Sequence, residues 1–88
     1  MNYLPIGSIV ILNKGIKKLM IYGRRQMAQS SGELYDYVGC PYPEGNISAQ
    51  YTYLFNHSDI QSVVFTGYVD EEENKFLEVI SSESEHTV

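Results

Sequence analysis

The sequence predicts a mostly β domain: a small SH3-like barrel or a strongly bent antiparallel sheet of about five strands, with a short C-terminal helix. Short apolar segments alternate with tight turns along the chain, a spacing typical of small all-β folds. Eight of the 88 residues are tyrosines, which suit half-buried strands. A doubly wound fold is excluded because the chain has no room for crossover helices. A helix lying across a flat antiparallel sheet is the alternative.

The first three strands are expected in the first half of the chain. Residues 8–13 and 17–27 form the first two, because Lys14 and Gly15 make a tight turn between them with the spacing of a β-hairpin. After a polar turn, residues 33–39 form the third strand, in which apolar and tyrosine side chains alternate.

The second half of the chain begins with a loop that contains two prolines, residues 40–45. This loop is predicted to be rigid, since proline fixes φ and glycine accepts conformations that other residues avoid. The sequence does not decide the structure of the polar connector at residues 46–50. A fourth strand is expected at residues 51–55, a single helical turn at residues 56–60 and a fifth strand at residues 61–69.

A C-terminal helix is predicted over residues 71–80. Asp70 stands three residues before Glu73, an arrangement typical of a capping box with acids at the positive end of a helix. The helix is too short to be stable alone, so its apolar face must pack on the sheet. This apolar face of the helix consists of Phe76, Leu77 and Ile80. Residues 81–88 are expected to form a flexible tail, which leaves residues 1–80 as the folded domain.

Cysteine content and hydropathy predict the compartment. A single cysteine excludes an internal disulfide, so nothing indicates an oxidising environment. The N-terminus lacks the basic and long apolar regions of a signal peptide. The longest apolar run, residues 9–12, is far shorter than the roughly 20 residues that span a bilayer. We therefore expect a cytoplasmic protein without a membrane partner.

The net charge of −5 is unevenly distributed, because five of the six basic residues fall within residues 14–25. Small barrels bind nucleic acids through basic grooves and stacking aromatics, so this stretch defines an alternative function. The acidic balance, with a pI near 4.8, opposes attraction to phosphate, and nucleic acid is not the expected partner. The residues of this alternative site are Lys17, Lys18, Tyr22, Arg24 and Arg25.

The chain offers no convincing catalytic or metal-binding set. Cys40 and His57 are the only pair that resembles a nucleophile and a base, but nothing basic near Cys40 in sequence would stabilise a thiolate. One cysteine and two histidines do not supply a zinc set. The acids at residues 70–73 lack the spacing of a calcium loop, and helix capping explains them. We expect a protein that is not an enzyme and that needs no cofactor or metal.

A protein-contact surface around the prolyl loop is the remaining candidate site. Aromatic side chains on a rigid loop lose little entropy on binding and are favoured as interface anchors. The alternative, that Tyr42 and Pro43 cover the domain's own core, stays open at this point. The residues assigned to the surface are Pro41, Tyr42, Pro43, Glu44, Gly45, Tyr53 and Phe55.

Tyr42-Pro43-Glu44-Gly45 and Phe55-Asn56-His57 are the most distinctive motifs of the chain. Together with further segments over about residues 3–72, they resemble a family of small Firmicutes proteins, the domain of unknown function 4176 family. Further matching segments are residues 4–10, 18–24, 35–40, 59–60 and 64–68.

Members of this family are often encoded beside type VII secretion genes and their LXG-type toxins. The resemblance therefore implies an accessory factor of such a cluster: a chaperone, a targeting factor or an adaptor that binds a secreted toxin or a secretion component. It implies no catalytic residues. Besides the nucleic-acid site, the second alternative function is a toxin-neutralising immunity protein, whose acidity would complement a basic toxin surface. An uncovered strand edge would also allow a homodimer.

Overall fold

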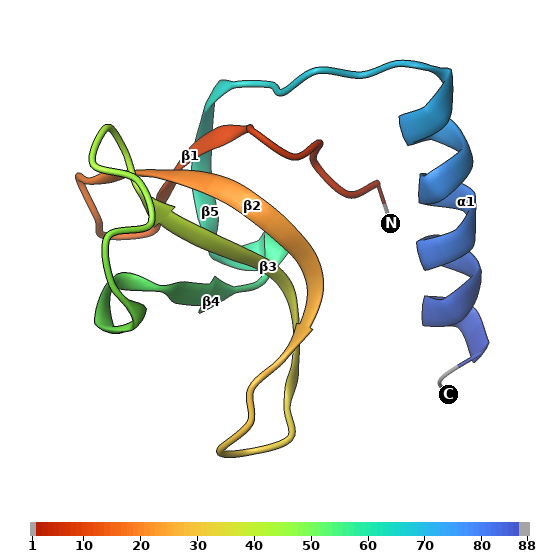
Figure 1. Ribbon diagram of the computed structural model, residues 1–88, viewed down its shortest axis with the longest axis horizontal. Coiled ribbons are helices and arrows are strands. Elements are labelled where there is room, and N and C mark those ends of the chain that lie inside the picture. Colours follow the sequence, from red (N-terminus) through yellow and green to blue (C-terminus); the bar gives the residue numbers. More distant parts are fainter. Residues whose placement is uncertain (1, 87–88) are drawn as a thin grey trace.

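Within residues 2–86, five strands form one antiparallel sheet in the order β4-β3-β2-β1-β5, and a single α-helix stands beside it (Figure 1). The structure, a computed structural model, describes residues 2–86. The sheet is open, with β4 and β5 as its two edges. The predicted mostly β fold is confirmed, and the chain adopts the bent sheet rather than a closed barrel.

The strands follow the predicted order, and the bounds of the first three agree with the prediction to within two residues. The strands are β1 (Ile9–Leu12), β2 (Lys18–Met27), β3 (Leu34–Pro41), β4 (Tyr53–Phe55) and β5 (Ile60–Phe65). The expected helical turn after β4 is a 3-10 turn, η2 (His57–Asp59). Its start is fixed by the Asn56 N–H, which donates to Asp59 Oδ2 at 2.8 Å.

The predicted fourth and fifth strands differ more from the observed ones. β4 begins at Tyr53 because the preceding residues form a 3-10 turn, η1 (Ala49–Tyr51). β5 ends at Phe65 rather than at residue 69, because the chain there leaves β1 and crosses the N-terminal segment. Gly67 N–H donates to Ser8 Oγ at 3.0 Å, and a Cβ on Gly67 would lie 2.2 Å from the Ile6 carbonyl oxygen.

β2 carries the bend of the sheet. Its ten residues pair with β1 at one end and with β3 along most of its length, and the β2–β3 register shifts between Ile21 and Gly23. A shift of this kind increases local twist. Gly23 is required at this point, since a Cβ would lie 2.6 Å from Val38 Cγ1 on β3. The bend brings the two ends of β2 into different surroundings (Figure 1).

The core lies on one face of the bent sheet and is centred on Tyr37, which is completely buried. Its ring packs edge-on against Tyr3 at 6.0 Å and tilted against Phe55 at 5.6 Å, measured between ring centroids. Burying an apolar side chain of this size contributes roughly 1.5–3 kcal/mol. The buried cluster consists of Tyr3, Val10, Leu19, Ile21, Tyr37, Phe55 and Ile80.

The helix α1 (Glu71–His86) ends six residues beyond the predicted end, so the expected tail is helical up to His86. Residues 87–88 lie outside the described part of the chain. The predicted cap at the start is present, because Glu73 N–H donates to Asp70 Oδ1 at 3.0 Å. Leu77 and Ile80 pack into the core as expected, whereas Phe76 stays 48% exposed.

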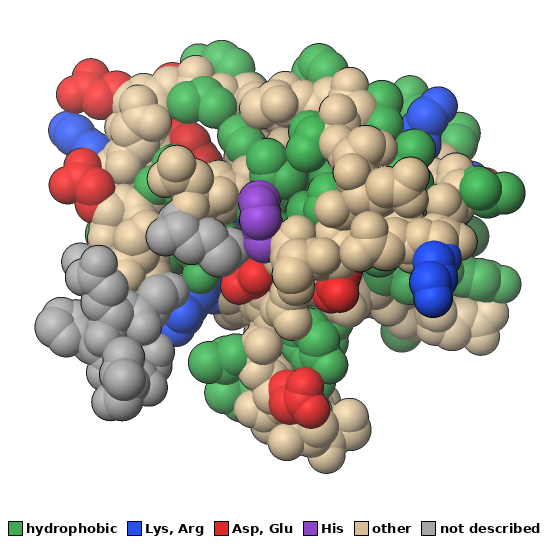
Figure 2. All heavy atoms as spheres, turned by 180° about the vertical axis from the view of Figure 1, so that it is seen from behind, with side chains coloured by type: hydrophobic (Ala, Val, Ile, Leu, Met, Phe, Trp, Pro, Cys, Tyr) green, Lys and Arg blue, Asp and Glu red, His purple; other side chains and the backbone are tan. Residues whose placement is uncertain are grey.

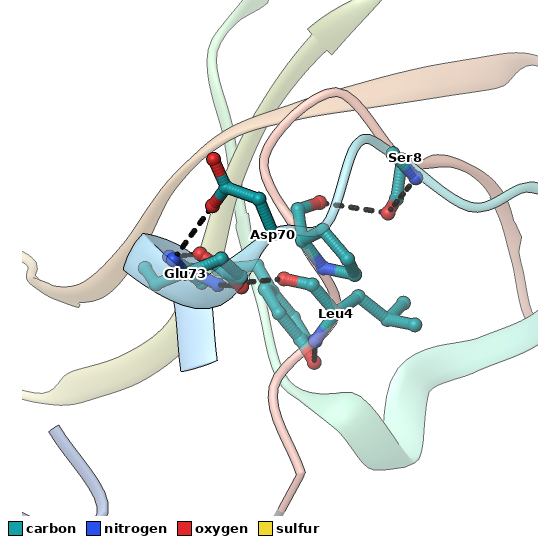
Figure 3. A network of polar contacts seen from close by, with 8 residues as sticks. Leu4, Ser8, Asp70 and Glu73 are labelled. Atoms are coloured by element: carbon teal, nitrogen blue, oxygen red, sulfur yellow. Dashed lines mark hydrogen bonds and ion pairs between the residues drawn. The ribbon is translucent and has the colours of Figure 1, made fainter. Parts of the chain in front are cut away.

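Hydrogen bonds and an ion pair join α1 and the N-terminal segment to the sheet (Figure 3). The Arg24 guanidinium on β2 donates to both carboxylate oxygens of Glu73, at 2.5 and 2.8 Å, and to the Leu4 carbonyl at 3.3 Å. It also lies 5.4 Å from the centroid of the Phe76 ring. Nearby, the buried Ser8 hydroxyl donates to the Pro5 carbonyl at 2.7 Å.

Tyr37 adds a second polar link between the N-terminal segment and the sheet. Leu4 N–H donates to the Tyr37 hydroxyl oxygen at 2.9 Å, and this hydroxyl lies 3.1 Å from His57 Nδ1. Burial raises the pKa of Tyr37, partly offset by the Leu4 N–H. The hydroxyl therefore keeps its proton, which it donates to His57 Nδ1 when that nitrogen is unprotonated.

Candidate functional site

The prolyl loop follows β3 directly and is held against the start of β2. Tyr42 N–H donates to the Lys18 carbonyl at 2.9 Å, and Gly45 N–H donates to the Pro41 carbonyl at 2.7 Å. Gly45 has a φ of 86°, which favours glycine. The turn is thereby fixed by the backbone, and it presents Pro43 and Glu44 to solvent.

A hollow of about 380 Å³ lies between this loop, η1 and β4. We call it the tyrosine hollow. Two tyrosines of its lining, Tyr51 and Tyr53, are each 40% exposed, and Ile47 is 59% exposed. The complete lining is Lys17, Pro41, Glu44, Ile47, Tyr51 and Tyr53.

An exposed ion pair lies at the tyrosine hollow. Lys17 Nζ is 2.7 Å from Glu44 Oε1, and the two side chains are 50% and 47% exposed. The hydrogen bond from Lys17 lowers the pKa of the Glu44 carboxyl. Exposed pairs of this kind contribute little to stability, so the pair gives the hollow a charge pattern rather than rigidity.

Two more hollows adjoin the prolyl loop and the β1–β2 turn. The hairpin hollow, of about 300 Å³, shares Lys17 and Tyr53 with the tyrosine hollow. The outer hollow, of about 480 Å³, is lined by Tyr42 of the prolyl loop and is mostly apolar. The hairpin hollow is lined by Leu12, Lys14, Gly15, Ile16, Lys17, Leu19 and Tyr53. The outer hollow is lined by Gly7, Ile9, Lys18, Met20, Tyr42, Val64 and Phe65.

The residues assigned to a contact surface from the sequence fall into two groups. Pro41 is buried, and Phe55 packs in the core at 2% exposure. The other five lie at the surface around the loop: Tyr42, Pro43, Glu44, Gly45 and Tyr53. Tyr42 is 45% exposed. The fold therefore leaves five of the seven residues accessible, with Tyr42 at the outer hollow and Tyr53 at the tyrosine and hairpin hollows, and it takes Pro41 and Phe55 into the interior.

Sequence reasoning missed three residues of the tyrosine hollow as members of this surface. Lys17 was assigned only to the alternative nucleic-acid site, and Ile47 and Tyr51 to no site. Ile47 is the lone large apolar side chain in an otherwise polar connector, and this was the available signal. Tyr51 and Tyr53 stand two residues apart, a spacing that would place both side chains on one face of the strand predicted at residues 51–55.

The five residues of the alternative nucleic-acid site do not form one patch. The Arg24 side chain is only 5% exposed and is bound to Glu73. Lys17 lies at the tyrosine and hairpin hollows, whereas Lys18 lies at the outer hollow. Tyr22 places its hydroxyl 3.5 Å from Thr52 Oγ1. Arg25 has a φ of 54° and lies beyond Arg24 on β2.

Cys40 and His57, the pair considered for catalysis, are both in contact with the core. Cys40 is 1% exposed, and His57 Nδ1 contacts the Tyr37 hydroxyl. Among the described residues, no three His, Cys, Asp or Glu side chains are grouped so that they could hold a metal ion. No helix within residues 2–86 is both long enough and apolar enough to cross a membrane.

The chain matches the family model described as Domain of unknown function (DUF4176) over residues 3–76. It belongs to the DUF4176 family. The membership indicated by the sequence motifs is thereby confirmed. The DUF4176 match contains the whole sheet and the prolyl loop, and it ends at Phe76, beside the Arg24–Glu73 pair. No curated protein and no solved structure matches the chain significantly.

Proposed function

We propose that this DUF4176 protein is a non-enzymatic protein-interaction module that binds its partner at the tyrosine hollow and the adjoining prolyl loop. The carrying observation is the half-exposed set Ile47, Tyr51 and Tyr53 around one hollow. Clustered exposed apolar and aromatic side chains mark interaction sites. Tyrosine is enriched at the centres of interfaces, where it contributes large contact area at low entropic cost.

The rigidity of the loop supports this proposal. The turn from Pro41 to Gly45 is fixed by backbone hydrogen bonds and is held to β2 through Tyr42 N–H. Because the free protein already has this geometry, a partner need not order the loop on binding, which reduces the entropic cost of association. The exposure of Tyr42 supports a contact role over that of a core cover.

In its cellular role, the module is proposed to be a cytoplasmic accessory factor of a type VII secretion cluster in a Gram-positive bacterium. The support is the family resemblance, which implies a chaperone, targeting factor or adaptor for an LXG-type toxin or a secretion component. In this role, the partner is a protein that meets the module before export.

Co-expression with each protein encoded beside the gene, followed by affinity purification of the tagged full chain, tests the proposal. We expect one neighbour to co-purify in stoichiometric amount. Replacing Tyr51 and Tyr53 by alanine is expected to reduce the retained partner about tenfold or more, as for interface hot spots. Tyr68→Ala is the matched control, because Tyr68 is 79% exposed and lines none of the three hollows near the prolyl loop.

Circular dichroism of each variant verifies that the fold is kept. Retention of the partner by the folded double tyrosine variant would rule out the tyrosine hollow as the binding site. Failure of every neighbour to co-purify would argue against the secretion-cluster role. Rescue of growth during toxin expression, without any effect on export, would favour an immunity protein instead.

A further inference from the structure

The tyrosine hollow and the hairpin hollow together form one continuous surface. They share Lys17 and Tyr53, so that these two side chains stand between the hollows. Each hollow has apolar residues on its lining, Ile47 in the first and Leu12 and Leu19 in the second. A ligand that fills both must therefore place apolar groups on either side of Lys17.

The charges around this surface are mostly positive. Lys14 and Lys17 line the hairpin hollow, whose lining contains no acid. The tyrosine hollow contains one acid, Glu44, and its carboxylate is already held by Lys17. Figure 2 shows lysine or arginine side chains on the side away from the helix as well as on the helix side, and acidic side chains on the helix side, near the centre and at the lower tip. The net charge of −5 therefore does not describe this end of the protein.

We propose that this surface binds an acidic peptide segment of a partner protein, in which a carboxylate at Lys17 is flanked by apolar side chains that enter the two hollows. The proposal rests on the proposed function and specifies the chemistry of the partner. Charge complementarity at Lys17 supports a carboxylate, and the apolar residues on both linings support a peptide that carries apolar side chains.

In the free protein, the Glu44 carboxylate occupies the position at Lys17 that the partner's carboxylate would take. Because the Lys17–Glu44 pair is about half exposed on both sides, exchanging one carboxylate for another exposes no buried charge. Glu44 therefore competes with the ligand for Lys17. Removing the Glu44 charge is expected to strengthen binding, whereas removing the Lys17 charge is expected to weaken it.

The arrangement also predicts a sequence pattern in the ligand. In an extended segment, side chains two residues apart point in the same direction. The ligand is therefore expected to carry an apolar residue, a spacer, an aspartate or glutamate, a spacer and a second apolar residue.

Selection of a random twelve-residue peptide library on the immobilised full chain tests this inference. The Lys17→Gln and Glu44→Gln variants are used in parallel. We expect the wild-type selection to enrich the apolar–acid–apolar pattern. Calorimetric titration of an enriched peptide is expected to give about two- to five-fold weaker binding for Lys17→Gln, as for an exposed charge pair, and tighter binding for Glu44→Gln. A control peptide carries asparagine or glutamine in place of the acid. Wild type should bind this control peptide more weakly than the acidic peptide, whereas Lys17→Gln should bind both peptides with the same affinity.

Three outcomes would overturn the inference: no enriched peptide, enriched peptides without an acid, or an enriched acidic peptide whose affinity is the same for wild type and Lys17→Gln. Salt-sensitive binding of a single-stranded DNA 20-mer that is lost in Lys17→Gln would assign the surface to nucleic acid instead. If the peptide selection fails while the double tyrosine variant still loses its co-purified partner, the interaction module stands and only the acidic chemistry falls.

Discussion

Two ion pairs near opposite ends of β2 each join a basic side chain to a glutamate and differ strongly in exposure. Arg24 and Glu73, at the end next to α1, have side chains that are 5% and 12% exposed. Lys17 and Glu44, at the end next to the prolyl loop, are 50% and 47% exposed. The first pair is surrounded by Leu4, Phe76 and the core, whereas the second borders open hollows.

The difference separates a part of the molecule that maintains the fold from a part that is available for contact. We call the first part the anchored end; it contains Leu4, Ser8, Arg24, Tyr37 and Glu73. At this end, removing one partner of the buried ion pair leaves the other charge buried and uncompensated, which destabilises the fold. At the prolyl-loop end, either charge of the exposed pair can be solvated by water or bound by another group. Variants of the two ends therefore separate stability from binding.

The largest expected effect comes from removing Arg24 alone. Arg24→Met leaves the Glu73 carboxylate nearly buried and unpaired, and it removes the donor to the Leu4 carbonyl. Loss of one partner of a buried pair costs about 3–5 kcal/mol. We expect the free energy of unfolding, measured by urea titration with circular dichroism, to fall by about 3 kcal/mol.

The double variant Arg24→Met with Glu73→Leu is the matched control. Since it replaces both charges by apolar groups of comparable size, it should recover a large part of the loss. A loss below about 1 kcal/mol for Arg24→Met alone would mean that the pair at the anchored end behaves like the exposed one, and the comparison would fail.

A second large effect is expected at Gly67, where the chain crosses the N-terminal segment. A Cβ there would lie 2.2 Å from the Ile6 carbonyl oxygen and 3.0 Å from its carbon. Both atoms belong to the backbone, so Gly67→Ala requires a backbone shift. Overpacking of this kind costs about 1–3 kcal/mol. Thermal unfolding should show the loss in Gly67→Ala and almost none in the neighbouring exposed control, Thr66→Ala.

The sequence was sufficient to predict the elements because their determinants are local. Alternating apolar residues and the Lys14-Gly15 turn define the first hairpin, and the Asp70 cap defines the start of α1. The early end of β5 was not predictable, because it depends on Gly67 meeting Ser8, 59 residues away. The end of α1 was also placed too early, since the polar residues after Ile80 gave no apolar face from which to extend the helix.

The candidate site was predictable only in part. The prolyl loop is defined by its own prolines and glycines, and it lies where the sequence suggested. Phe55 was misplaced because β4 is short, and its pairing with Tyr37 on β3 turns this ring into the core. Arg24 was assigned to a basic stretch because its partner, Glu73, is 49 residues away. Long-range partners decide which charges remain at the surface.

A smaller effect is expected at Tyr37, whose hydroxyl accepts from Leu4 N–H and contacts His57 Nδ1. Tyr37→Phe leaves the ring in place and removes both contacts, which is expected to cost about 1 kcal/mol. Because the pKa of Tyr37 is raised in the folded protein by burial, its contribution is complete below the ordinary tyrosine pKa and is lost as the pH rises through the folded value.

The pH dependence provides the measurement for Tyr37. The free energies of unfolding of wild type and Tyr37→Phe, measured by urea titration from pH 7 upwards, should converge at alkaline pH. The other tyrosines titrate in both proteins and cancel in the difference. A difference that stays constant through the tyrosine range would show that the hydroxyl is not protected by the core, and the anchored end would then be more open than its burial indicates.

The smallest effect on stability is expected at the exposed pair. Lys17→Gln should leave the urea midpoint at the wild-type value, because both charges are already solvated.

The effect of Lys17→Gln should appear instead on Glu44, whose pKa is lowered mainly by the hydrogen bond from Lys17. The lowered pKa means that the interaction is present above the ordinary glutamate range and is lost as the pH falls through the folded value. Carboxyl NMR titration should therefore show the Glu44 pKa rising towards its ordinary value in Lys17→Gln. A fall in the urea midpoint as large as that of Arg24→Met would show instead that the prolyl-loop end also maintains the fold, and the exchange of Glu44 for a partner's carboxylate would then unfold the site that it is meant to fill.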